Sequence, residues 1–91
     1  MRSAFRASFG RDLKRIRNES ILAGVRQAIL DIETAAQWGD VADIKKLRGA
    51  TNAYRIRIKD YRIGLFIDDD LAKFVRSTTP GYLSQVSLNF V

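Results

Sequence analysis

The stretch YRIRIKDYRIGLFI, residues 54–67, decides the fold. Apolar and basic residues alternate with a period of two on either side of the pair Lys59-Asp60, and Tyr, Ile and Phe dominate, which is typical of two half-buried strands. Taking Lys59 and Asp60 as the two turn residues predicts a hairpin with a fixed register. That register pairs Ile58 with Tyr61, Arg57 with Arg62, and Ile56 with Ile63.

The predicted hairpin has an apolar face and a basic face. The apolar face holds Tyr54, Ile56, Ile58, Tyr61, Ile63, Leu65 and Ile67. The basic face holds Arg55, Arg57 and Arg62, with Gly64 as a bare position beside them and Phe66 further along. Like charges directly opposite one another destabilise a strand pair. Two interpretations stay open: the arginines bind a polyanion through their guanidinium forks, or they spread into solvent.

The composition restricts the possible chemistry. The chain has 91 residues, which predicts one domain over residues 1–91, and its net charge of +6 favours an acidic partner, either nucleic acid or an acidic protein segment. It has no Cys and no His. Since these are the usual metal ligands and the usual general base, we expect no metal or other cofactor, and any catalysis must use Arg, Lys, Tyr or carboxylates. Neither a membrane span nor a signal peptide is apparent, so a cytoplasmic location is expected.

The N-terminal part predicts a strand and two helices. Apolar and polar residues alternate over residues 2–6, which predicts a short strand. Ser8 fits the N-cap of an amphipathic helix over residues 9–17. The outer face of that helix is basic, so it is either solvated or steers nucleic acid. Asn18 fits the cap of a longer helix over residues 21–37, whose apolar stripe should pack on the Tyr54 and Ile56 face of the hairpin.

Shorter segments flank the hairpin. The pair Trp38-Gly39 should end the long helix, and Asp40 should cap one further turn through residue 44. The segment at residues 45–49, which carries three basic side chains, then leads into the hairpin. Beyond the hairpin, residues 68–70 are three Asp and should form a solvated turn, and residues 71–76 a third strand of an antiparallel meander. Residues 82–91 carry no charge and fit neither the helical nor the strand period cleanly, and we favour a further strand over a helix.

These segments together resemble the RelE/ParE superfamily of toxins from bacterial type II toxin-antitoxin systems, on the RelE-like side. The resemblance lies in SFGRDLKRI at residues 8–16, IKKLRG at 44–49 and YRIRIKDYRIGLFIDDDLAKFVR at 54–76. It extends over about residues 5–76, whereas residues 77–91 depart from the pattern. The resemblance implies an α+β, RelE-like fold in which two N-terminal helices pack on a small antiparallel β-sheet.

The resemblance also implies an activity and partners. RelE-like toxins cleave mRNA on the ribosome: the RNA 2′-hydroxyl attacks the adjacent phosphate, and the protein orients it, stabilises the charge and assists proton transfer, with no metal. A cognate antitoxin chain wraps and neutralises the toxin. By position, Arg57 and Arg62 would contact the phosphate and the transition state, supported by Arg55. Further candidates are Lys45, Lys46 and Arg48 for binding the RNA backbone, and Arg76 and Tyr82 as additional catalytic residues.

The C-terminal segment leaves three functions open. In RelE-like members basic residues and a Tyr follow the strand that ends in FVR, whereas STTPG and an uncharged tail follow it here. The protein is therefore a ribosome-dependent mRNA endonuclease with a rebuilt site, an attenuated toxin relative that binds an antitoxin, or a ParE-like inhibitor of DNA gyrase. The hairpin match favours the first function, and the missing basic residues favour the other two.

Overall fold

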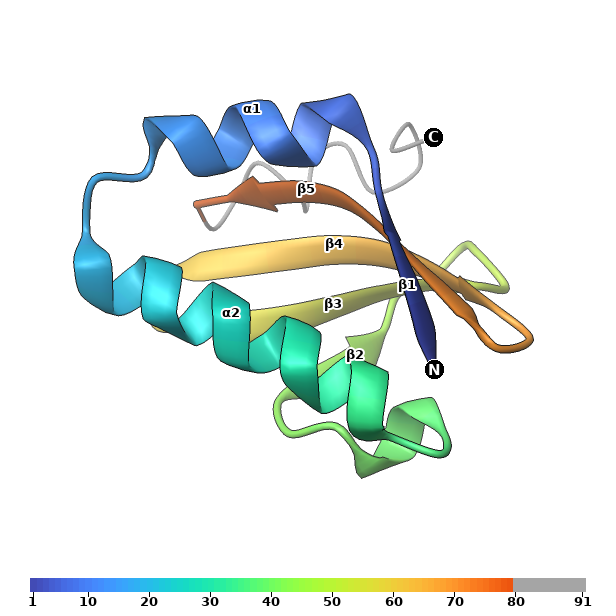
Figure 1. Cartoon of the computed structure of the whole chain (residues 1–91). Helices are drawn as coiled ribbons and strands as arrows, with labels where there is room; N and C mark the ends of the chain where they lie inside the picture. Colours follow the sequence, from blue (N-terminus) through green and yellow to red (C-terminus); the bar gives the residue numbers. More distant parts are fainter. Residues whose placement is uncertain (80–91) are drawn as a thin grey trace.

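A computed structural model describes residues 1–79 of the chain, as a five-stranded sheet with two α-helices (Figure 1). The elements in chain order are β1 (Arg2–Phe5), α1 (Ala7–Arg15), α2 (Glu19–Thr34), the 3-10 helix η1 (Trp38–Asp40), β2 (Ile44–Lys46), β3 (Ala53–Ile58), β4 (Tyr61–Asp68) and β5 (Leu71–Thr78). Within these residues no helix is long and apolar enough to cross a membrane. The predicted α+β fold class is confirmed, and residues 82–91 lie outside the described part.

The sheet has the strand order β1-β5-β4-β3-β2 and is mixed. Strands β2 to β5 pair antiparallel, as the hairpin connections require, but β1 pairs parallel with β5. The expected small antiparallel sheet is therefore present in β2 to β5, and β1 makes the whole sheet mixed. The reason is that β1 reaches the sheet from outside the meander, so no short turn forces it to run antiparallel to its neighbour.

The hairpin register predicted from the sequence is confirmed. Strand β3 pairs with β4 through Ile56 and Ile63, Arg57 and Arg62, and Ile58 and Tyr61. Lys59 and Asp60 form the turn, and Lys59 has a φ of 50°, in the left-handed region that a two-residue hairpin turn demands. The third strand, β5, is also confirmed and runs two residues beyond the predicted end at residue 76.

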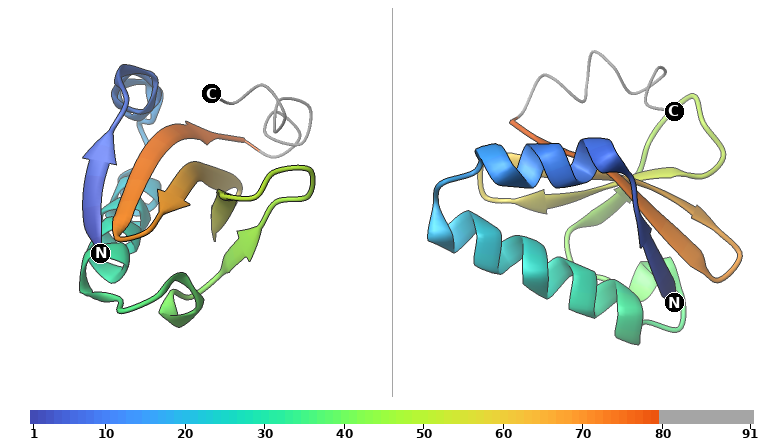
Figure 2. Two further views of the ribbon diagram at one scale, coloured as in Figure 1. Left: turned by 90° about the vertical axis from the view of Figure 1, so that its right-hand side faces the viewer. Right: turned by 45° about the horizontal axis from the view of Figure 1, so that its top comes forward.

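The core lies between α2 and the apolar face of the sheet. The buried stripe of α2 is Ile21, Val25, Ala28 and Ile32, and it shares one cluster with Tyr54, Ile56, Ile63, Leu65 and Phe74 of the sheet. Figure 2 shows α2 crossing one side of the twisted sheet, while α1 runs beside β5. The predicted packing of the long helix on the hairpin is therefore confirmed, and neither helix of residues 1–79 covers the opposite face of the sheet.

The cap of α2 is confirmed and the cap of α1 is not. The Oδ1 atom of Asn18 accepts hydrogen bonds from the backbone N–H groups of Ser20, at 2.9 Å, and Ile21, at 3.2 Å. Helix α1 begins at Ala7 with Arg6 at the cap position, and Ser8 lies inside the helix. The hydroxyl of Ser8 instead donates to the backbone carbonyl of Val75 at 2.6 Å, because β5 presents an unpaired carbonyl there.

The segment between α2 and the hairpin also differs from the sequence prediction. Its helical turn is η1 at Trp38–Asp40 rather than residues 40–44, and residues 44–46 are the strand β2. Lys45 therefore pairs with Arg55 of β3 instead of lying in a loop. The exposed edge of β3 offers backbone partners to any neighbouring segment, and this tertiary pairing overrides the weak local preference.

Two helix glycines give a matched test of the packing of α2 on β3. A Cβ atom built on Gly24 would lie 2.6 Å from Cγ2 of Ile58, whereas one on Gly10 of α1 meets nothing within 4 Å. We expect Gly24→Ala to lower the free energy of unfolding by about 1–3 kcal/mol through overpacking. Gly10→Ala should raise it by about 0.5–1 kcal/mol through helix propensity. Urea unfolding of both variants measures this, and equal stabilisation by both would show that α2 does not pack this closely.

Candidate nucleic-acid interface

The face of the sheet opposite α2 carries the hairpin arginines at its centre. Arg57 and Arg62 lie directly opposite one another on β3 and β4, with Arg57 exposed and Arg62 half-buried. Arg55 follows two residues before Arg57 on the same face. We call Arg55, Arg57 and Arg62 the arginine face. Within residues 1–79 no carboxylate forms an ion pair with any of these three side chains.

A row of paired positions crosses four strands through this face. Lys45 of β2 is opposite Arg55, Arg55 is opposite Gly64, and Gly64 is opposite Arg76 of β5. Gly64 is buried and has no side chain, so no side chain of its own separates the two arginines in this row. The register therefore brings Lys45 and Arg76, two residues singled out from the sequence, into line with the arginine face.

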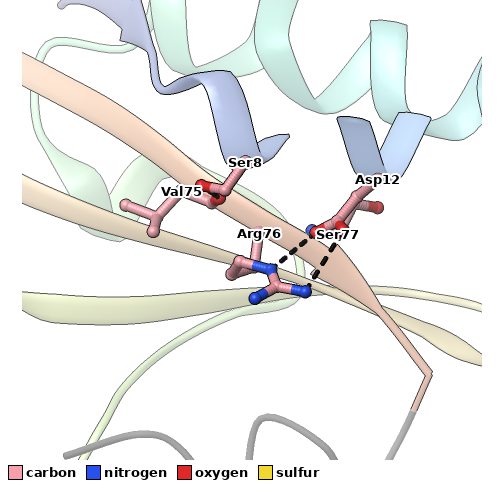
Figure 3. Close-up of polar contacts among 5 residues, drawn as sticks. All are labelled: Ser8, Asp12, Val75, Arg76 and Ser77. Carbon is pink, nitrogen blue, oxygen red and sulfur yellow. Dashed lines mark hydrogen bonds and ion pairs between the residues drawn. The ribbon is translucent and has the colours of Figure 1, made fainter. Parts of the chain in front are cut away.

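A buried carboxylate fixes Arg76. Asp12 of α1 has 7% of its side chain exposed and accepts two hydrogen bonds from the Arg76 guanidinium, from Nε to Oδ2 at 2.8 Å and from Nη2 to Oδ1 at 3.2 Å (Figure 3). The same Oδ2 accepts the backbone N–H of Ser77 at 2.8 Å. Such a bidentate pair restricts both the position and the orientation of the guanidinium.

Helix α1 completes the edge of β5 beyond the end of β1. The backbone N–H of Arg6 donates to the Phe74 carbonyl at 2.9 Å, and the Ser8 and Asp12 contacts follow at Val75 and Ser77. The Phe9 and Phe74 ring centroids lie 5.4 Å apart beneath these polar contacts. The edge backbone groups that β1 no longer reaches are thus satisfied by α1, which places Asp12 beside Arg76.

Sequence reasoning missed Asp12. A signal was present, because Asp12 lies three residues after Phe9 and four before Ile16, on the inner stripe of the helix rather than on its basic outer face. A charged residue on a core-facing stripe predicts a buried partner. The partner is 64 positions away in the chain, so its identity was not readable from the local pattern.

Crowding of like charges changes the electrostatics of the arginine face. Partial burial lowers the pKa of the Arg62 guanidinium below its ordinary value, the positive charges of Arg57 and then Arg55 lower it further, and Asp60 opposes the shift. An arginine keeps its charge at any working pH, so the shift means that partial burial and the neighbouring charges of Arg57 and Arg55 both make the charged Arg62 less favourable than it is in water. A bound anion would offset the repulsion between these charges.

The remaining predicted site residues are placed differently. Lys46 pairs with Tyr54, whose ring is in the core, so alternation along β2 puts Lys46 on the other side of the sheet from the arginine face. Arg48 is exposed in the loop between β2 and β3. Tyr82 lies outside the described residues. Within residues 1–79 no three side chains of the types that bind metals lie close enough together to hold a metal ion.

A pocket of about 230 Å³ adjoins the Asp12 and Arg76 pair. Its walls are Asp12, Arg15, Ile16, Tyr61, Arg76, Ser77, Thr78 and Thr79. These residues come from the C-terminal half of α1 and the residue after it, the start of β4 and the end of β5. The pocket therefore lies at the end of the sheet where the paired residues Arg62 and Thr78 meet.

Comparison with known proteins settles the family. No family model matches the chain. It is 34% identical over 77 residues to the protein named toxin RelE3 of Methanocaldococcus jannaschii, and the match covers 84% of this chain and 86% of that protein. The chain belongs to the RelE family of toxin–antitoxin toxins. This assignment confirms the family that the sequence motifs indicated.

Two solved structures share the fold. The RelB-RelE antitoxin-toxin complex from Methanococcus jannaschii matches with a TM-score of 0.75 and 27% identity, over 97% of this chain and 99% of that one. The YoeB dimer from Staphylococcus aureus matches with a TM-score of 0.71 and 17% identity, over 90% and 98% of the two chains. The second likeness concerns the fold alone.

The opposed arginines of this RelE-family toxin should repel one another measurably. We expect Arg57→Gln and Arg62→Gln each to raise the free energy of unfolding, because either change removes a like-charge cross-strand pair whose cost is about 0.2–1 kcal/mol. In a double-mutant cycle the two gains should therefore be less than additive, and the coupling should shrink as salt screens the charges. Chemical unfolding at low and high salt measures this, and strictly additive effects would show that the guanidinium groups do not interact.

Proposed function

We propose that this RelE-family toxin cleaves mRNA on the ribosome and that the arginine face binds the scissile region of the RNA. The observation that carries the proposal is the direct opposition of Arg57 and Arg62, with no described carboxylate paired to either. A fold that keeps two like charges opposed on one face of a sheet gains stability when an anion binds between them. Guanidinium groups match phosphate oxygens in bidentate fashion, which makes an RNA backbone the best-fitting anion.

The proposed reaction needs only groups that RNA, water and this chain supply. The 2′-oxygen forms a bond to the adjacent phosphorus and the bond from phosphorus to the 5′-oxygen breaks, while a water molecule accepts the 2′ proton and another gives a proton to the 5′-oxygen. Arg57 and Arg62 would bind the phosphate oxygens as negative charge builds on them, which is the largest contribution a protein makes to such a step. They would also hold the 2′-oxygen in line with the leaving oxygen.

Arg55, Lys45 and Arg76 would extend the RNA-binding surface. They share one row across the sheet, in which Arg55 and Arg76 lie on either side of Gly64. Arg76 has its Nε and one terminal nitrogen on Asp12, so it would act from a fixed position. Exposed Arg48 would contact the RNA from the neighbouring loop, while Lys46, on the other side, is the least suited of the predicted contacts.

We further propose that a cognate antitoxin neutralises the toxin by covering the arginine face. Support comes from the fold likeness to the toxin of the RelB-RelE complex and to that of the DinJ-YafQ complex of E. coli. An acidic or helix-forming antitoxin segment would remove the same charge repulsion that RNA removes, so the two ligands would exclude one another. Because ribosomes are the target, both partners would meet in the cytoplasm.

Cleavage on programmed ribosomes tests the function. We expect the wild-type protein to cut a defined mRNA bound to the ribosome and Arg62→Ala to cut it about 10²–10³-fold more slowly, because one charge-stabilising contact is lost. Arg26→Ala is the matched control, since Arg26 is an exposed arginine of α2, which packs on the opposite face of the sheet. Mapping of RNA 5′ ends over time measures all three rates.

Two outcomes would contradict the proposal in different ways. Equal cleavage by wild type and Arg62→Ala would show that the arginine face is not part of the cleavage site. No cleavage by the folded wild-type protein would exclude the nuclease, leaving an attenuated toxin that only binds its antitoxin or a ParE-like gyrase inhibitor. A gyrase supercoiling assay would then separate these two alternatives.

A further inference from the structure

Strand β5 contains a β-bulge at Val75. Phe74 pairs with Leu65 and Arg76 pairs with Gly64, although Leu65 and Gly64 are adjacent in β4, so Val75 is one extra residue. Burial shows the same irregularity, because it alternates along β5 except at Phe74 and Val75, which are both buried. A residue inserted in this way changes which side of the sheet the following side chains face.

The bulge decides on which face of the sheet Arg76 lies. A regular ladder from Phe74 onward would pair Arg76 with Ile63, which is fully buried in the core. With the extra residue, Arg76 pairs instead with Gly64, on the same side of the sheet as Arg62 two positions earlier in β4. The bulge therefore brings a charged side chain into line with the arginine face instead of the core, and bulges beside functional sites commonly redirect a side chain in this way.

Helix α1 holds the bulge and its arginine from the edge of the sheet. The hydroxyl of Ser8 donates to the carbonyl of Val75, which is the bulge residue itself. One turn later, Asp12 accepts two hydrogen bonds from the Arg76 guanidinium and one from the backbone N–H of Ser77 (Figure 3). These two α1 residues thus fix the carbonyl before Arg76, the guanidinium itself and the N–H group after it.

Stability alone is a weak reason for a carboxylate at position 12. Apolar side chains of similar volume often stabilise a fold as well as a buried ion pair does. The Asp12 side chain, which is 7% exposed, also places a negative charge beside a surface that is proposed to bind RNA. What the ion pair does provide is orientation, because two hydrogen bonds from one guanidinium to one carboxylate fix the plane of the Arg76 side chain.

We propose that the Val75 bulge, Ser8 and Asp12 position Arg76 to contact a phosphate of bound RNA. This inference rests on the proposed function of the arginine face. Arg76 is the residue that touches the RNA, whereas Ser8 and Asp12 are positioning residues that act through it. A guanidinium that is already oriented loses less conformational freedom when RNA binds, and this gain in affinity outweighs the repulsion between Asp12 and the phosphate.

RNA affinity distinguishes positioning from simple charge, because the two predict changes of opposite sign. Asp12→Asn removes one negative charge and so raises the net charge from +6 to +7, which by charge alone should tighten RNA binding. We expect it instead to weaken the binding of a short single-stranded RNA about twofold to tenfold, because Arg76 loses its fixed orientation. Equal or tighter binding by Asp12→Asn would overturn the inference.

Asp31→Asn is the matched control for the change in charge. Asp31 lies on α2, which packs on the other face of the sheet, and its carboxylate accepts a hydrogen bond from Gln27. This variant has the same net charge as Asp12→Asn and should bind RNA no more weakly than wild type. A similar loss of affinity in both variants would contradict a specific function of Asp12.

A double-mutant cycle tests whether Asp12 acts through Arg76. Arg76→Gln should weaken RNA binding, and adding Asp12→Asn to it should cause no further loss. Ser8→Ala should weaken binding only while Arg76 is present, whereas its control Ser3→Ala, which removes a hydroxyl bonded to Glu33, should have no effect. A loss caused by Asp12→Asn that is equally large with and without Arg76 would show that Asp12 serves only the fold.

Melting temperatures identify any variant that does not fold, and Arg76→Lys keeps the test decisive if Asp12→Asn is one of them. Lysine retains the charge but cannot form the two-pronged contact with Asp12, so Arg76→Lys should weaken RNA binding at unchanged net charge. Arg26→Lys makes the same change on α2 and should bind RNA as wild type does. Wild-type affinity in Arg76→Lys would overturn the inference.

Cleavage on ribosomes separates this inference from the proposed function. If Arg62→Ala abolishes cleavage while Asp12→Asn and Arg76→Gln change neither the RNA affinity nor the cleavage rate, the proposed function holds and the positioning of Arg76 is wrong. If wild type binds RNA but does not cleave it, the nuclease proposal fails. The changes in RNA affinity then decide the positioning inference on their own.

Discussion

The register of the β3–β4 hairpin is the constraint on which the rest of the structure depends. Side chains alternate with a period of two, so a slip of one residue would move Ile56 and Ile63 into solvent and Arg57 and Arg62 into the core. The two-residue turn prevents that slip, with Lys59 in the left-handed conformation. The same register therefore places the apolar side chains that pack under α2 and the opposed arginines on the other side of the sheet. A shift in register would change both the core packing and the pairing of the arginines.

Asp12 is a second constraint and joins the helical layer to the proposed site. A buried carboxylate is costly unless it is paired, and this one is satisfied by the Arg76 fork and by the Ser77 backbone. The contact holds the end of β5 against α1.

The sequence was sufficient for features set by local periodicity. The hairpin, its register and α2 followed from alternation, a helical stripe and the Asn18 cap, and the register alone brought Arg57 opposite Arg62. Features set by tertiary partners were not readable. The strand at residues 44–46 exists because β3 has an open edge, Ser8 bonds to Val75 rather than to its own helix, and β1 joins in parallel. The link from Asp12 to Arg76 spans 64 positions, so only the fold revealed it.

The salt dependence of RNA affinity tests most directly whether the arginine face binds phosphate. A short single-stranded RNA is titrated into wild type, into Arg57→Gln/Arg62→Gln, and into Arg2→Gln/Arg26→Gln as a control of equal charge. For single strands the slope of log affinity against log salt is about −0.7 per phosphate contact. We predict that the slope becomes shallower by about 1.4 in the first double variant, for two lost contacts, and stays unchanged in the control. An affinity that does not depend on salt, or the same slope in all three proteins, would contradict the account.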